Sequence, residues 1–133
     1  MFQHDFTVRL SQTDAGGVVY FAEYFNIAHQ CYEAFLDTVM PVNEGIEQGI
    51  LMPIVHAEAD YHAPLRISRK ATVTLTTRAI KRGSYGMDYA IKSADGTPIA
   101  TVHTVHAVIG LDWKPRRIPN NLKEALEQLQ KVP

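Results

Sequence analysis

Residues 13–36 read TDAGGVVYFAEYFNIAHQCYEAFL, and the spacing of the apolar residues changes within this stretch. From Phe21 onward, apolar and aromatic residues recur every three to four positions, which is the spacing of one face of an α-helix. Further apolar side chains widen that face, so we expect a helix buried on more than one side, ending near Pro41. Two consecutive glycines at positions 16 and 17 precede it and permit a turn with positive φ.

The segments on either side of this stretch alternate between apolar and polar residues, which is typical of β-strands. We expect strands over residues 2–12, 50–62, 71–80, 85–93 and 99–109. Residues 42–49 are polar and contain glycine, so they are expected to form a surface loop. Asp95-Gly96 predicts a hairpin turn. A short amphipathic helix is expected to begin at Asn120 or Asn121.

This order of elements predicts an α+β fold in which an antiparallel sheet of about five strands wraps around the long helix, with a short helix at the C-terminus. A length of 133 residues is that of one domain, so we expect a single domain over residues 1–133. Such a sheet leaves open edges. Pairing the edges of two subunits across a two-fold axis removes one of them, so we expect a homodimer or homotetramer.

Composition excludes several classes of protein. No run of about 18 apolar residues predicts a transmembrane helix, and the N-terminus does not resemble a signal peptide. The single cysteine, Cys31, cannot form an internal disulfide. We therefore expect a cytoplasmic protein that does not insert into membranes.

The charges are distributed unevenly along the chain. The net charge is −1, which provides no general attraction for nucleic acid. Residues 1–65 contain one basic residue and nine acidic ones, whereas residues 66–133 contain twelve basic residues and five acidic ones. This asymmetry indicates either a basic surface for an anionic ligand or charges that are simply solvated, and the sequence leaves both interpretations open.

Asp14 lies in the glycine-containing bend immediately before the expected helix. The first amides of a helix have no intrahelical partner and carry partial positive charge, so they can polarise a carbonyl oxygen. A carboxylate beside them could attack that carbonyl or activate water, which meets the requirements of acyl-transfer chemistry. The residues also allow a simpler interpretation, in which Asp14 is a turn residue and the glycines only shape the bend.

The same stretch resembles a known family. Residues 13–36 are similar to the signature of hotdog-fold acyl-CoA thioesterases of the 4-hydroxybenzoyl-CoA thioesterase and YbgC-like group, in which a segment of this type leads into a long helix. Residues 55–64, VHAEADYHAP, resemble the family's second strand, and residues 117–119, RIP, its common end. A narrower likeness is to 1,4-dihydroxy-2-naphthoyl-CoA hydrolases, through residues 18–21, a histidine in the helix and residues 52–57, MPIVHA.

The resemblance implies hydrolysis of an acyl-CoA thioester to a free acid and coenzyme A, without a cofactor or a metal. It implies that Asp14 is the catalytic carboxylate, acting as nucleophile or general base, and that the backbone amide near Phe21 holds the thioester oxygen. Many family members have histidine where this chain has Phe21, and Gln12 replaces an aspartate. The substrate-binding residues implied are Val19, Tyr20, Tyr24, Phe25 and His56, the last facing Asp14 of a partner subunit.

Basic residues near the middle of the chain are candidates for binding the phosphates of coenzyme A. The turn containing Lys81, Arg82 and Ser84 is our preferred site, because arginine and lysine both pair with phosphate. Solvated charges on a sheet edge are an equally acceptable interpretation of these residues. Trp113, beside several basic residues, is a further place where an adenine could lie.

Other residues allow alternative functions. Glu33 could act as the base, since a related hotdog branch carries its carboxylate on the helix, and His29 is interpreted as structural. His56 and His62, or His103 and His106, lack the convergence that a metal site needs. The alternatives to an aromatic acyl-CoA hydrolase are a broad-specificity fatty acyl-CoA thioesterase, a dehydratase or hydratase, and a non-catalytic acyl-CoA-binding protein.

Overall fold

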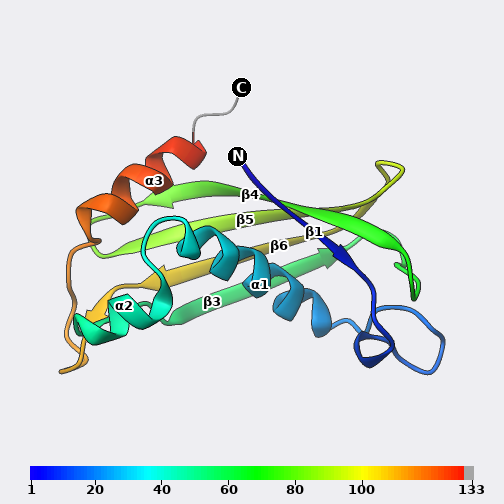
Figure 1. Ribbon diagram of the computed structural model, residues 1–133, viewed down its shortest axis with the longest axis horizontal. Coiled ribbons are helices and arrows are strands. Elements are labelled where there is room, and N and C mark those ends of the chain that lie inside the picture. Colours follow the sequence, from blue (N-terminus) through cyan, green and yellow to red (C-terminus); the bar gives the residue numbers. More distant parts are fainter. Residues whose placement is uncertain (131–133) are drawn as a thin grey trace.

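Five antiparallel strands form the main sheet, in the order β1-β4-β5-β6-β3 (Figure 1). The structure, a computed structural model, describes residues 1–130, so the last three residues of the expected domain lie outside the described residues. The strands of this sheet are β1 (Phe2–Thr7), β3 (Ile54–Tyr61), β4 (Lys70–Ile80), β5 (Ser84–Ser93) and β6 (Pro98–Ala107). A small second sheet pairs β2 (Ile50–Leu51) with β7 (Ile109–Gly110).

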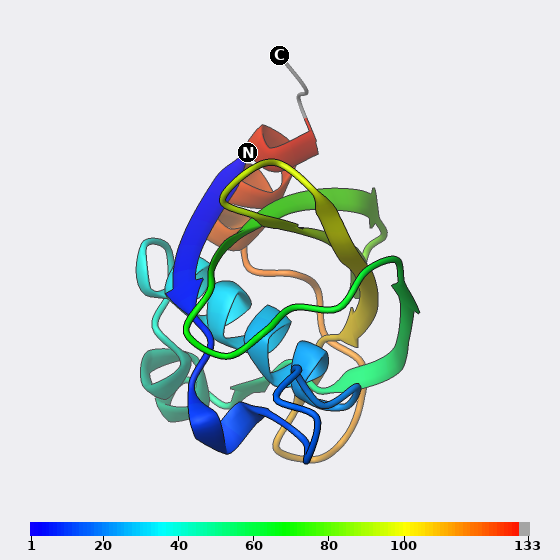
Figure 2. The ribbon, with the colours of Figure 1, turned by 90° about the vertical axis from the view of Figure 1, so that its right-hand side faces the viewer.

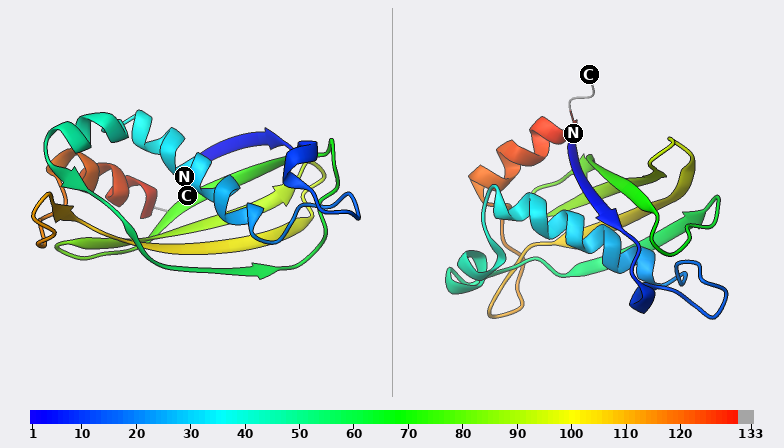
Figure 3. Two further views of the ribbon diagram at one scale, coloured as in Figure 1. Left: turned by 90° about the horizontal axis from the view of Figure 1, so that it is seen from below. Right: turned by 45° about the vertical axis from the view of Figure 1, so that its right-hand side comes forward.

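All three α-helices lie on one face of the main sheet (Figure 3). They are α1 (Glu23–Asp37), α2 (Val42–Glu47) and α3 (Asn120–Gln130), and a 3-10 turn covers Leu10–Gln12. Viewed end-on, the sheet curves around α1 (Figure 2). Within residues 1–130, none of the helices has the length and apolarity needed to cross a membrane.

The core lies between α1, α3 and the inner face of the sheet. Alternate residues of the central strands face the helices, because successive side chains of a strand point to opposite sides. These inward residues include Val73, Leu75, Met87, Tyr89, Ile91 and Val102, which pack with Ile27, Cys31 and Leu36 of α1 and with Leu122 and Leu126 of α3. The buried residues of α1 recur every three to four positions and form one face, whereas Gln30, Glu33 and Asp37 are exposed, so the expected burial on more than one side is wrong. This one-sided burial fixes α1 along the sheet and so positions the segments at its two ends.

Strand β3 is an open edge of the sheet. It pairs with β6 on one side only, and seven of its eight residues are exposed. Val55, for example, retains 62% of its accessible surface although it is strongly apolar. An exposed edge of this length can pair with a further strand, which is the feature on which our expectation of a dimer rests.

The structure corrects five elements that we expected from the sequence. The expected strand over 99–109 divides into β6 and β7, which belong to different sheets. Residues 42–49 are not only a loop, because they contain α2, a helix too short to show a periodicity. The expected strand over 50–62 divides at Pro53, which has no amide hydrogen to continue the ladder. The first strand ends at Thr7 rather than at residue 12, and α1 begins at Glu23 rather than near Phe21.

A polar cluster lies within the core, centred on His106. The imidazole is fully buried and stacks against the rings of Tyr32 and Tyr85, with centroids 4.3 and 5.2 Å away. Its Nε2 lies 3.0 Å from the Thr104 hydroxyl and its Nδ1 lies 3.4 Å from the Met52 carbonyl, which can only accept a hydrogen bond. Burial lowers the pKa of His106 from 6.5 to about 4, so the ring is neutral near pH 7.

We predict that His106 makes the stability of the protein depend on pH. Its pKa is lower in the folded chain than in the unfolded chain, so the stabilisation is present above pH 6.5 and is lost as the pH falls toward 4. From pH 7 to pH 5, the free energy of unfolding should fall by roughly 2 kcal/mol more in the wild type than in His106→Phe. Urea unfolding at several pH values measures this difference, and parallel curves for the two proteins would contradict the assignment.

Candidate active site

The bend before α1 holds Asp14 in a defined conformation. One carboxylate oxygen, Oδ1, accepts a hydrogen bond of 2.8 Å from the Gly16 amide, and the Asp14 amide donates to the Val18 carbonyl. Gly17 has φ of +75°, a conformation that side-chain-bearing residues rarely adopt, which explains the second glycine. The carboxylate is exposed, so it is accessible to a ligand or to water.

The start of α1 offers an unpaired amide near this bend. No side chain caps the first turn of the helix, and within the described chain the Phe21 amide donates no backbone hydrogen bond. The Phe21 carbonyl accepts a hydrogen bond of 2.9 Å from the Tyr61 hydroxyl, which ties this segment to the end of β3. Tyr20 and Phe21 are both about half exposed, with their rings 4.7 Å apart. The segment therefore combines an exposed carboxylate, an amide without a backbone hydrogen-bond partner and exposed apolar side chains.

A cavity of about 820 Å³ lies beside the C-terminal half of α1. Its volume falls within the range of small-molecule sites. Its polar side chains are His29, Glu33, Asp37 and Asn43. The remaining lining residues are aliphatic or aromatic: Tyr32, Leu36, Val42, Ile46, Ile50, Leu51, Met52, Pro53, Ile54, Ile109 and Trp113.

A second, smaller cavity of about 400 Å³ is strongly basic. It lies between the β4–β5 turn and the start of α3, and four of its seven lining residues are cations: Lys81, Arg82, Arg117 and Lys123. The Ile118 amide donates to the Arg82 carbonyl, which joins the turn to the segment before α3. The sequence identified Lys81 and Arg82 but not their two neighbours, because only the fold brings those elements together. Ser84, the third residue expected here, does not line this cavity.

The bend lies at one end of the folded molecule, and both cavities lie at the other end. Figure 1 shows residues 13–22 at the right of the molecule, whereas α2, the β4–β5 turn and residues 111–118 lie at the left, and Figure 3 agrees. A single chain therefore does not bring Asp14 to the apolar cavity or to the basic one.

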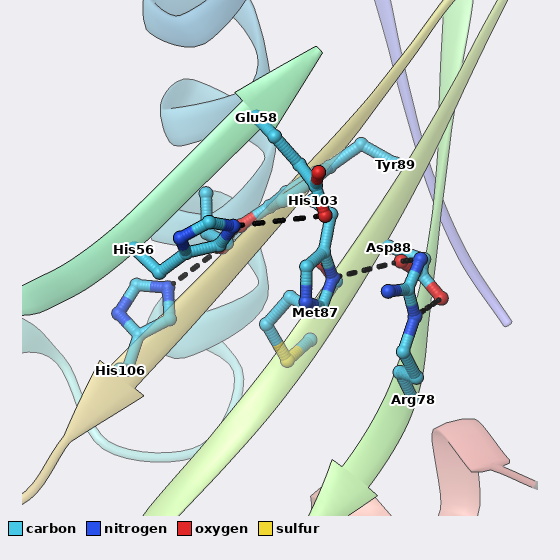
Figure 4. Close-up of polar contacts among 9 residues, drawn as sticks. His56, Glu58, Arg78, Met87, Asp88, Tyr89, His103 and His106 are labelled. Carbon is cyan, nitrogen blue, oxygen red and sulfur yellow. Dashed lines mark hydrogen bonds and ion pairs between the residues drawn. The ribbon is translucent and has the colours of Figure 1, made fainter. Parts of the chain in front are cut away.

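The outer face of the sheet carries a separate set of charged residues, including His56 (Figure 4). His56 lies 3.6 Å from Glu58, and His103 contacts Asp88 at 2.9 Å, which in turn pairs with Arg78 at 2.7 Å. These side chains face away from α1. Within one chain His56 does not line the apolar cavity, so its contact with a substrate stays a prediction. No three potential metal ligands are grouped together in the described part of the chain.

The other substrate-binding residues expected from the sequence divide into buried and exposed ones. Val19 and Tyr24 are buried in the core, at 5% and 4% exposure, and Phe25 packs against it. Tyr24 contacts the ring of Tyr61, and burial raises the pKa of its hydroxyl. Of the residues expected to contact the substrate near Asp14, Tyr20 and Phe21 are the strongly exposed ones. Their roles in binding stay predictions.

Sequence reasoning missed Trp113 and the α2 residues Val42, Asn43 and Ile46 as parts of the apolar cavity. It treated Glu33 only as an alternative base and His29 as structural. The spacing of His29, Glu33 and Leu36 along one helix was an available signal, since residues three and four apart share a face. The rest of the cavity is built from segments distant in sequence.

A long helix covered by a five-stranded antiparallel sheet, with a carboxylate in the bend before the helix, defines a hotdog-fold protein. The sequence matches the thioesterase-like superfamily over residues 8–126. It is 32% identical to a 1,4-dihydroxy-2-naphthoyl-CoA hydrolase of Synechococcus elongatus over 135 residues, with 95% of each chain covered. It is 35% identical to the hydrolase of the same name from Rippkaea orientalis over 131 residues, with 92% of this chain and 89% of the relative covered.

A solved structure is similar over nearly the whole chain. The crystal structure of a 1,4-dihydroxy-2-naphthoyl-CoA thioesterase from Synechocystis gives a TM-score of 0.90 at 29% identity, and 98% of each chain is covered. The chain belongs to the thioesterase-like superfamily. The α+β hotdog fold expected from the sequence is confirmed.

Proposed function

We propose that the protein hydrolyses an aromatic acyl-CoA thioester to the free acid and coenzyme A, with 1,4-dihydroxy-2-naphthoyl-CoA as the first candidate substrate. The class of enzyme, a thioester hydrolase, follows from the family. The relatives named for that substrate support the candidate, because they match this chain over almost its full length. The observation that carries the mechanism is the exposed Asp14 carboxylate in the bend that leads to the uncapped start of α1.

In the proposed reaction, the thioester oxygen accepts a hydrogen bond from the Phe21 amide, which stabilises the negative charge that develops on it. Asp14 then acts in one of two ways. As a nucleophile it attacks the carbonyl carbon, coenzyme A leaves as a thiolate that takes up a proton, and water hydrolyses the resulting mixed anhydride. As a general base it removes a proton from the water that attacks the carbonyl carbon, after which the C–S bond breaks and coenzyme A leaves as a thiolate that takes up a proton. Neither route as proposed needs a metal or a cofactor.

We propose that two chains form each active site. The apolar and basic cavities lie at the opposite end of the folded subunit from Asp14. One subunit therefore does not present Asp14 and both cavities to the same substrate. Antiparallel pairing of the two exposed β3 edges across a two-fold axis would bring the Asp14 segment of one subunit toward the cavities of the other. The exposure of β3 and of Val55 supports this arrangement. A homotetramer would contain two such pairs.

The basic cavity is the proposed site for the phosphates of coenzyme A. Its cations are not balanced by an acidic residue among those that line it, so it attracts the 3′-phosphate and the pyrophosphate. Arg82 and Lys81 keep the role expected from the sequence, and Arg117 and Lys123 join them. Contact with Ser84 stays a prediction.

We predict that Asp14→Asn lowers kcat by at least about a hundredfold, which is the usual size of a general-base or nucleophile contribution. The carboxylate is exposed, so the thermal unfolding of the variant should match that of the wild type. Release of free thiol from an aromatic acyl-CoA measures the rate. Glu47→Gln, which changes an exposed carboxylate of α2, is the matched control and should retain full activity. Wild-type turnover by the Asp14→Asn protein would refute the mechanism.

We also predict that Arg82→Ala raises KM roughly three- to tenfold for an acyl-CoA, because one exposed charged contact to phosphate is lost. KM should not change for the same acyl group on pantetheine, which lacks the nucleotide phosphates. Lys92→Ala, at an exposed cation near the far end of β5, should affect neither substrate. An equal rise in KM for the two substrates would place the phosphates elsewhere.

A further inference from the structure

Trp113 is the single tryptophan of the chain, and it is unusually exposed, retaining 75% of its surface. It also has φ of +64°, one of two residues other than glycine with positive φ within residues 1–130. A bulky residue in this conformation is strained, and such strain persists only where the surrounding structure enforces it. Strained residues of this kind concentrate at ligand-binding sites.

The turn around Trp113 is held by several hydrogen bonds. The Trp113 amide donates to the Gly110 carbonyl at 2.9 Å, and the Gly110 amide donates to the Lys114 carbonyl at 2.9 Å. Asp112 accepts from the Lys114 amide and pairs with Arg116 at 3.1 Å. These contacts fix the backbone of the turn and so the position from which the exposed indole projects.

That place is the wall of the apolar cavity, where Trp113 joins Pro53, Ile54 and Ile109. The residues that line this cavity include the carboxylates of Glu33 and Asp37 but no lysine or arginine. A polyanionic nucleotide is disfavoured in such a cavity, whereas the basic cavity attracts it. The uncharged acyl group is the part of the substrate that suits this mainly apolar lining best.

We propose that Trp113 is a specificity-determining residue, on whose ring a flat aromatic acyl group stacks inside the apolar cavity. The inference rests on the proposed function, since it names the acyl class that this thioester hydrolase prefers. A flat ring gains from stacking on indole, whereas an aliphatic chain gains only from the apolar surface that it covers.

Kinetics of Trp113 variants test this preference. Trp113→Ala should lower kcat/KM about tenfold for an aromatic acyl-CoA, the size expected for a lost aromatic contact, and less than about threefold for hexanoyl-CoA. Trp113→Phe should restore most of the aromatic activity. Leu111→Ala, which shortens an exposed side chain of the same loop that does not line the cavity, is the control and should change neither rate. Equal losses for the two substrates in Trp113→Ala would overturn the proposal.

Fluorescence gives a readout that does not depend on catalysis, because Trp113 is the only source of indole emission. In the Asp14→Asn protein, binding of the aromatic acyl-CoA should quench or shift this emission, whereas free coenzyme A should leave it nearly unchanged. The double variant Trp113→Phe, Leu111→Trp places the single tryptophan outside the cavity. Its emission should not change when the aromatic acyl-CoA binds. An equal response to free coenzyme A, or no response while calorimetry shows that the acyl-CoA binds, would overturn the proposal.

The two hypotheses fail in different ways. If thiol is released and Asp14→Asn abolishes the release, but Trp113 does not respond to the acyl group, the stacking proposal fails and the proposed function stands. If the emission responds to the aromatic acyl group but wild-type protein releases no thiol, the proposed function fails and the binding role of Trp113 stands.

Discussion

Burial of α1 against one face of the sheet is the constraint on which the remaining structure depends. The helix covers the inward side chains of the central strands, and the hydrophobic contacts made there are the main source of stability. The helix lies along this face of the sheet. Its N-terminal bend and its C-terminal half are therefore held at opposite ends of the sheet. The exposed Asp14 and the apolar cavity are consequences of this single packing arrangement.

The same arrangement explains how charge is divided along the chain. The cations of the basic cavity, Lys81, Arg82, Arg117 and Lys123, all come from the basic second half of the sequence. The apolar cavity takes its carboxylates, Glu33 and Asp37, from the acidic first half. The two cavities therefore differ in charge although they lie at the same end of the molecule, and this difference suits a substrate with an anionic nucleotide and an uncharged acyl group.

The sequence predicts the fold well because its signals are local. The spacing along α1, the alternation in the strands and the glycine bend at positions 16 and 17 each depend on neighbouring residues. The cavities could not be predicted in this way, since Trp113 meets Ile54 and α2 only after the chain has folded. The edge strand β3 shows a second limit, because alternation could not indicate that His56 would lie on the face turned away from α1. The helix α2 was missed since six residues are too few to establish a period.

Subunit complementation tests most directly whether two chains build one active site. The Asp14→Asn and Arg82→Ala proteins are mixed, dissociated and reassociated, and hydrolysis is measured at a substrate concentration well below KM. If each site takes Asp14 from one chain and Arg82 from its partner, half of the dimers are hybrids with one intact site of two. With the residual activity of the Arg82→Ala dimers, the mixture should then reach about 30% of the wild-type activity, against about 5–17% for the average of the two variants. A mixture no more active than the average of the two variants would show that each chain works alone.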